Sequence, residues 1–488
     1  MPTQPLPDNP SLENLRKQAK SLRKAYENRN PEALSRVREF SPHPDTAPGT
    51  LTLAAAQLVI ARSYGVPSWS RLKQHLEQVR AHFWTSPAEP STPESEPVED
   101  RFVRLACLTY QADHPRRREE ARKLLAANPS IARHSIYTAA TVGDTAAARE
   151  ILAGNPKFAN VRGGPNNWEP LLYAAYSRLN SEAAGHSTLD VARMLLAHGA
   201  DPNAGFFWDG RYLFTALTGV FGEGESGPIH QAPHQYCDEF ARMLLEAGAD
   251  PNDSQTLYNR MFTGGTAHLE LLHEFGLGIT TNNVWSRRLG PVLETPAQML
   301  QQQMAWAVKY NQMERLRWLV DHGVDVNIPD TRFHETPYRL AMLNGNREAA
   351  QYLLDHGAHP ISLSDLDSFA AACLTADSET ARRLLAKNAT LLNQLGHRRA
   401  ELLNRAAEED RRDAIRLMIE LGFDLRHAPN ALHHAAGGGL LEMVKLLIEF
   451  GADPTIRDPT YDATPMGWAR YFNRPAVLEY LQQFEPSA

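Results

Sequence analysis

The chain has 488 residues, of which 42% are hydrophobic and 22% charged, and its formal net charge is -7. Single hydrophobic cores stop growing near roughly 250 to 300 residues, so this length predicts two domains or an array of repeated units. The acidic balance offers no basic excess to neutralise phosphate groups, which argues against nucleic acid and anionic membranes as partners.

The cysteines and the apolar runs bear on the compartment. The three cysteines, Cys107, Cys237 and Cys373, lie far apart, which gives no disulfide framework and is typical of a reducing compartment. No apolar run approaches the roughly 20 residues needed to span a bilayer, and the first residues lack the pattern of a secretory signal. We therefore expect a cytoplasmic protein with no membrane partner.

The first 83 residues contain four stretches typical of helices, at 11–28, 31–40, 51–64 and 68–83. Ser11 and Ser68 are suitable N-caps, and Pro31 occupies the first helical position, where proline is favoured. We interpret residues 1–83 as a small helical domain. Residues 84–100 are mainly Pro, Ser and acidic residues, which bury too little apolar area to offset the entropy of ordering. They predict a linker.

From residue 101 to 488 one pattern recurs. Paired aliphatic residues of a helix are followed by glycine and then by Asp-Pro or Asp-Val, and Gly-Ala-Asp-Pro-Asn occurs twice, at 199–203 and 248–252. Glycine can adopt the left-handed conformation after the helix, and Asp-Pro turns the chain away. Related ends include Gly323, Gly357 and Gly451. Upstream helices carry Thr-Pro at their start, at 336–337 and 464–465, with small residues at their middle.

These motifs resemble the ankyrin family, whose period is about 33 residues. The resemblance implies an all-α solenoid of about ten or eleven helix-turn-helix repeats, preceded by the helical N-terminal domain and capped by residues 464–484. It implies binding through the concave face of first helices and fingers, and gives His433 the role of tying neighbouring repeat loops by hydrogen bonds. Residues 56–69 and about 160–290 also resemble segments of bacterial ankyrin-repeat proteins.

Two repeats are longer than the others. Insertions near 176–188 and 219–237 fall between the two helices of adjacent repeats. Because corresponding insertions of a solenoid emerge on the same face, they could form a joint wall beside the groove.

Aromatic residues near these insertions are candidates for partner binding. Exposed aromatic side chains bring a large contact area at low entropic cost, and three consecutive rings are hard to place in a core one helix layer thick. The alternative is that the rings fill the packing between repeats. The candidates are Trp168, Phe206, Phe207, Trp208, Tyr212 and Tyr258.

Polar residues of the same span suggest two further sites. Glu169, Arg211, Asn259 and Arg260 could converge with the aromatic rings on a small polar ligand. His230, His234 and Cys237 are weak metal-ligand candidates, because two prolines interrupt the helix that their spacing requires and a fourth ligand is missing. We therefore expect no metal site and no cofactor.

The sequence contains no nucleophile elbow, phosphate loop or dinucleotide-binding motif. The main hypothesis is accordingly a non-enzymatic interaction scaffold that binds a protein or peptide through the concave face and the inserted loops. The alternative is an enzyme or small-ligand receptor with a pocket between the insertions, around residues 165–262.

Overall fold

The computed structural model describes residues 6, 11–43, 47, 50–85, 96–180, 184–280, 283–289 and 294–484. The structure is 61% helical, with many short helices. It divides into two compact units, Met1–Gln303 and Met304–Ala488, each of which is considered by itself.

The first unit begins with the predicted helical domain. Its four helices are α1 (Leu12–Glu27), α2 (Pro31–Phe40), α3 (Leu53–Ser63) and α4 (Trp69–Ala81). Their apolar faces meet in one core that includes Leu15, Val37, Val59 and Leu72. Ser68 caps α4 as predicted, since its hydroxyl accepts from the Arg71 amide, whereas Ser11 precedes α1 without a side-chain cap hydrogen bond.

A small sheet joins this domain to the repeats. Strand β1 (Phe83–Trp84) pairs in parallel with β2 (Gly205–Trp208), which pairs antiparallel with β3 (Tyr212–Thr215). The helix expected to reach Phe83 therefore ends at Ala81, and Phe83 instead begins the short strand β1. The fold is mainly helical, as predicted, but this short sheet was not anticipated.

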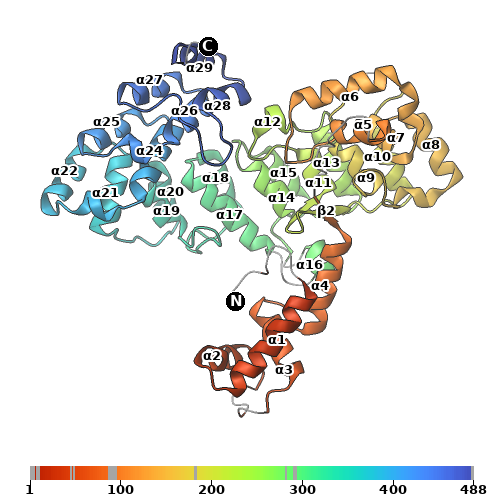
Figure 1. Cartoon of the computed structure of the whole chain (residues 1–488), viewed down its shortest axis with the longest axis horizontal. Helices are drawn as coiled ribbons and strands as arrows, with labels where there is room; N and C mark the ends of the chain where they lie inside the picture. Colours follow the sequence, from red (N-terminus) through yellow and green to blue (C-terminus); the bar gives the residue numbers. More distant parts are fainter. Residues whose placement is uncertain are drawn as a thin grey trace. The chain divides into compact units, whose positions relative to one another are not determined.

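Helix pairs follow in chain order from residue 98. Within each unit most first helices of successive pairs contact one another, as do several second helices, which is the arrangement of a solenoid (Figure 1). In the first unit the pairs are α5 (Val98–Ala106) with α6 (Pro115–Ala127), α7 (Ile136–Val142) with α8 (Thr145–Gly154), α9 (Pro170–Tyr176) with α10 (Thr188–Ala197), α11 (Ala216–Phe221) with α13 (Cys237–Glu246), and α14 (Ser254–Arg260) with α15 (Ala267–Glu274).

Shorter helices interrupt this series. They are η2 (Pro129–Arg133), η3 (Pro156–Ala159), α12 (Gly227–His230) inside the second insertion, and α16 (Val284–Leu289), which contacts α4. The ends of the predicted linker lie in β1 and α5, residues 86–95 lie outside the described residues, and 181–183 of the first insertion do so too.

The second unit continues with further pairs, from green to dark blue in Figure 1. Its core includes Phe369, Leu403, Ala436 and Met443. The helices are α17 (Pro296–Lys309), which begins before the boundary, α18 (Met313–Asp321), α19 (Pro337–Leu343), α20 (Arg347–Asp355), α21 (Asp365–Leu374), α22 (Ser378–Lys387), α23 (Leu391–Gln394), α24 (Arg398–Glu408), α25 (Arg412–Glu420), η4 (Leu425–His427), α26 (Ala431–Gly438), α27 (Leu441–Glu449), α28 (Pro465–Tyr471), α29 (Pro475–Leu481) and η5 (Gln482–Phe484).

The repeated turn has a defined hydrogen-bond pattern. Gly199 and Gly248 have φ values of 83° and 98°, so the predicted left-handed glycine is confirmed. The asparagine that ends each motif joins one turn to the next. The Asn203 side chain donates to the Gly248 carbonyl at 2.9 Å and accepts from the Asp250 amide at 2.9 Å. Asn327 does the same with Gly357 and His359, which explains why asparagine recurs there.

Candidate functional site

Three of the six aromatic candidates are core residues. Trp168 and Phe206 are buried and stack at 4.4 Å between ring centroids, with the Trp84 ring 5.1 Å from each. Phe207 is buried on the opposite face of β2 beside Trp285, at 5.9 Å. The expected exposure is wrong for these three rings. Alternation along β2 sends Phe206 and Phe207 to opposite faces of the sheet, where the rings of Trp84 and Trp285 cover them.

The side chains of the other three candidates are at least partly exposed to solvent. Tyr212 is 45% exposed, with the Arg211 guanidinium 5.3 Å from its ring centre. Trp208 is half-buried, and its indole N–H donates to the Thr109 carbonyl at 3.1 Å. Tyr258 is half-buried, and its hydroxyl donates to Glu225 of the second insertion. Two of these three rings, Trp208 and Tyr212, flank the tip of the β2–β3 hairpin, which therefore presents an aromatic surface.

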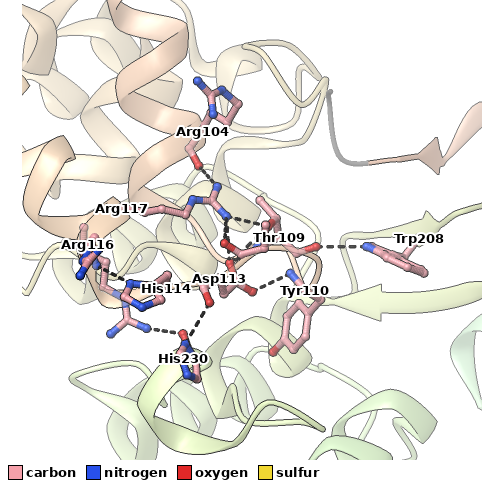
Figure 2. A network of polar contacts seen from close by, with 11 residues as sticks. Arg104, Thr109, Tyr110, Asp113, His114, Arg116, Arg117, Trp208 and His230 are labelled. Carbon is pink, nitrogen blue, oxygen red and sulfur yellow. Dashed lines mark hydrogen bonds and ion pairs between the residues drawn. The ribbon is translucent and has the colours of Figure 1, made fainter. Parts of the chain in front are cut away.

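The second insertion is docked onto the first pair of helices (Figure 2). The Asp113 carboxylate accepts from the amides of Thr109 and Tyr110, at 3.0 and 2.7 Å, and so holds the loop between α5 and α6. His230 Nδ1 lies 3.2 Å from the Asp113 carbonyl oxygen, and Arg118 donates to the His230 carbonyl. These contacts fix the position of the insertion.

A buried guanidinium fixes both insertions. Arg178, in the first insertion, is fully buried and donates to the Ala232 carbonyl of the second at 2.6 Å and to the Gly219 carbonyl at 2.5 Å. It also donates to the carbonyls of Ala175 and Ser177, at 3.0 and 2.8 Å. Burial lowers the pKa of Arg178 to about 10. Backbone carbonyls thus accept from the N–H donors of this guanidinium, so the Arg178 side chain stabilises the packing of the two insertions against the repeats.

The histidines of the metal hypothesis have other partners. His234 Nε2 lies 3.0 Å from the Thr188 hydroxyl, and its Nδ1 accepts from the Tyr236 amide at 3.1 Å. Burial, and to a lesser degree Arg178, holds the pKa of His234 well below its ordinary value. Burial raises the pKa of Cys237 to about 11, which disfavours a thiolate ligand. Within the described part of the chain, no cluster of His, Cys, Asp and Glu could hold a metal ion.

The polar candidates of the same region lie in three separate places. Glu169 lies 3.6 Å from Arg162, and burial raises its pKa. Arg260 pairs with Glu223 of the second insertion, and the Asn259 side chain accepts from Gln255 at 2.9 Å. Arg211 lies at the tip of the hairpin. Helix α11 lies between the helices that carry Glu169 and Asn259.

A cavity in this unit is small. It is lined by residues between 202 and 285, including Asp253 and Trp285, and its volume is about 20 Å³. That volume suffices for about one water molecule. The four polar candidates are not among its lining residues.

A larger pocket lies in the second unit, on its first helices. Its volume is about 420 Å³, within the range of roughly 300 to 1,000 Å³ typical of ligand sites. Helices α17, α19, α21 and α24 and the loop at Phe333 line it. The lining residues with polar or aromatic side chains include Lys309, Tyr310, Phe333, Asn404, Arg405 and Glu408.

Aromatic rings and cationic side chains together form one wall of this pocket. The Lys309 ammonium lies 4.6 Å from the centre of the Phe333 ring and 5.3 Å from that of Tyr310. The Arg405 guanidinium lies 5.5 Å from the Tyr310 ring centre. Burial, and next the neighbouring Arg405, lowers the pKa of Lys309, while burial raises that of Tyr310 to about 12. The pocket therefore combines rings with closely spaced cations.

The same arginine ties the pocket's helices together. Arg405 donates to the Lys309 carbonyl at the end of α17 and to the Asn344 side chain after α19. The Glu409 carboxylate forms ion pairs with both Arg405, at 2.7 Å, and Arg411, at 2.6 Å. Arg411 donates to the Asn344 carbonyl at 3.0 Å. These contacts hold the pocket's walls in place without filling the pocket.

Sequence reasoning missed this pocket. Trp306, Lys309 and Tyr310 have the i, i+3, i+4 spacing of one helix face, which is the available signal. Arg405 is 96 residues from Lys309, and that separation is closed only by the stacking of the repeats. The expected role of His433 is confirmed, since its ring nitrogens lie 3.1 and 3.0 Å from the carbonyls of Pro429 and Ala463.

Comparison with known families matches three segments of the chain. Residues 166–205 match a model of a single ankyrin repeat, residues 304–354 one of ankyrin repeats in many copies, and residues 403–487 one of three ankyrin repeats. The search of the curated proteins finds no match. The chain thus contains ankyrin repeats in several regions, as the sequence motifs predicted. Among the described residues, no helix has both the length and the apolar character to cross a membrane.

Proposed function

We propose that this chain, with ankyrin repeats in several regions, is an interaction scaffold that binds a protein or peptide through its first helices and the loops beside them. Ankyrin repeats are typical protein-binding scaffolds. The observation that carries the proposal is the 420 Å³ pocket on the first helices of the second unit, which the chain's own side chains leave unfilled. A side chain of a bound polypeptide would occupy it.

The hairpin tip supplies a second contact. Tyr212, Arg211 and Trp208 present aromatic and guanidinium groups, which are enriched in binding hot spots. The insertions contribute through their exposed residues, such as Glu225 and Ile229, because Arg178 and His230 hold the rest against the repeats. Cys107, Cys237 and Cys373 are free thiols, which supports binding in the cytoplasm.

Site-specific photo-crosslinking tests this proposal. A benzophenone amino acid replaces Glu401 at the pocket or Tyr212 at the hairpin, and matched positions on second helices, Arg382 and Arg242, serve as controls. We expect Glu401 and Tyr212 each to capture specific polypeptides from host lysate, identified by mass spectrometry, and the controls to capture none of them. The same capture from Arg382 and Arg242 would reject the proposed face.

Native mass spectrometry separates the scaffold from a receptor or enzyme. Protein purified from its host should show the mass of the polypeptide chain, alone or with a bound polypeptide. A retained small molecule of constant mass would instead favour a ligand-binding or catalytic pocket.

A further inference from the structure

The pocket of the second unit holds a cation without an ion-pair partner. Among the residues described between 304 and 484, no carboxylate lies within ion-pair distance of the Lys309 ammonium, whose contacts are the rings of Phe333, Tyr310 and Trp306 at 4.6, 5.3 and 6.0 Å. The ring faces favour the charge, but they leave the N–H donors of the ammonium available. This half-buried group therefore has capacity for an anionic acceptor.

The surroundings of Lys309 favour one added negative charge. Arg405 and Arg332 lie near it and disfavour its charged form, whereas Glu408 and Glu409 favour it. Glu409 is shared by Arg405 and Arg411, at 2.7 and 2.6 Å, so this carboxylate is already engaged by two guanidinium groups. A carboxylate entering the pocket would offset the repulsion among the cations.

A second polar group in the pocket lacks a partner. The side-chain oxygen of Asn404 is buried and makes no hydrogen bond within the described structure, although Asn404 lines the pocket. A buried acceptor without a donor is unfavourable, because the loss of its contact with water is not offset by a hydrogen bond. Rotation of the Asn404 side chain toward the pocket would let this oxygen accept from a backbone N–H of a bound polypeptide, a donor that a simple inorganic anion lacks.

The rim limits how much negative charge the pocket accepts. Glu401 and Glu408 are exposed, line the pocket and lie two helical turns apart on α24. Glu408 favours the charged form of Lys309 from this position without forming an ion pair with it. A segment with several adjacent acidic residues would be repelled by these two carboxylates.

We propose that this pocket binds one acidic side chain, Asp or Glu, of an extended partner segment, with its carboxylate on Lys309 and a backbone N–H on Asn404. The residues next to the acidic one are uncharged. This inference rests on the proposed scaffold function and names the chemistry that its pocket recognises.

Selection from a displayed library of random nonapeptides tests the inference with the full chain. Wild-type protein should enrich peptides with one Asp or Glu at a fixed position and no acidic neighbours. Lys309→Met keeps the apolar stem and should bind these peptides about tenfold more weakly or worse, the loss expected for one charged hydrogen bond. Lys309→Glu should instead select Lys or Arg at that position.

A matched control uses another lysine of the same unit. Lys387, on the second helix α22, is exposed and pairs with Asp365 at 2.7 Å, so Lys387→Met should select and bind as wild type does. All variants should keep the wild-type thermal midpoint. Enriched peptides without an acidic residue, or equal binding by Lys309→Met, would overturn this inference while leaving the scaffold function in place. No enrichment by any protein would overturn both.

Two further variants examine Asn404 and the rim. N-methylation of the tightest peptide at each backbone amide should reveal one position that weakens binding to wild type but not to Asn404→Leu. Glu408→Gln should increase the tolerance for a second acidic residue in the peptide. The absence of any amide position that depends on Asn404 would contradict the assignment of that contact.

Discussion

The irregular span of the first unit and the pocket region of the second differ in whether their polar and aromatic side chains are buried and hydrogen-bonded within the chain. In residues 165–262, Trp168, Phe206 and Phe207 are buried, and the Arg178 guanidinium is satisfied by the chain's own carbonyls. In residues 304–411, the Lys309 ammonium and the Asn404 oxygen line an unfilled pocket. Departures from the repeat consensus thus serve internal packing in the first unit, whereas the pocket of the second unit includes a buried polar atom without a hydrogen bond.

The largest expected effect tests the packing half of this contrast. Trp168→Ala should lower the free energy of unfolding by about 4 kcal/mol, because a large buried ring is lost from contact with Phe206, Trp84, Tyr173 and Tyr176. Urea unfolding measures the change. Tyr212→Ala, at an exposed ring, should cost less than about 0.5 kcal/mol. Equal effects of the two substitutions would remove the distinction between buried and available rings.

A smaller effect compares the two cations directly. Arg178→Met leaves buried carbonyls, including those of Ala232 and Gly219, without donors and should cost about 3 kcal/mol. Lys309→Met retains the ring contacts and should cost less than about 1 kcal/mol. Denaturant titration of both variants measures these two losses in the free energy of unfolding. A Lys309→Met loss as large as that of Arg178→Met would assign Lys309 a structural role.

The smallest effect concerns pH. Burial, with Arg178 nearby, keeps His234 neutral in the folded chain, while the unfolded chain takes up a proton as the pH falls below about 6.5. The unfolded state then binds more protons, so stability decreases towards low pH. From pH 7 to 5 the wild type should lose about 2 kcal/mol more than His234→Gln. Identical pH dependence of the two proteins in urea unfolding would show that His234 becomes charged in the fold.

The predictable part of this molecule is local in sequence. Gly199 and Gly248 marked the turns because few other residues accept a left-handed backbone, and His433 stood in a motif that carries its role. The pairing of Phe83 with Phe207 was not predictable, because a two-residue strand has no periodicity and its partner is remote. The pocket was missed for the same reason, since Lys309 and Arg405 meet only after the repeats stack.

The prediction that the aromatic candidates are exposed failed for a different reason. The residues themselves were well chosen as large contact groups, but the cover over them comes from Trp84 and Trp285, which lie outside the repeat motif. A repeat pattern describes what each unit contributes and omits what neighbouring segments add. Rings next to a finger are therefore poor evidence of a free surface wherever another segment can form a strand beside it.

Strand β1 has a consequence for the integrity of the chain. Phe83 and Trp84 pair with β2, and the Trp84 ring packs on Trp168 and Phe206, so the helical domain is attached to the repeats by more than the peptide bonds that follow. A protein cleaved between Thr85 and Glu96 would remain one particle, and its two fragments, produced separately, would reassemble by complementation.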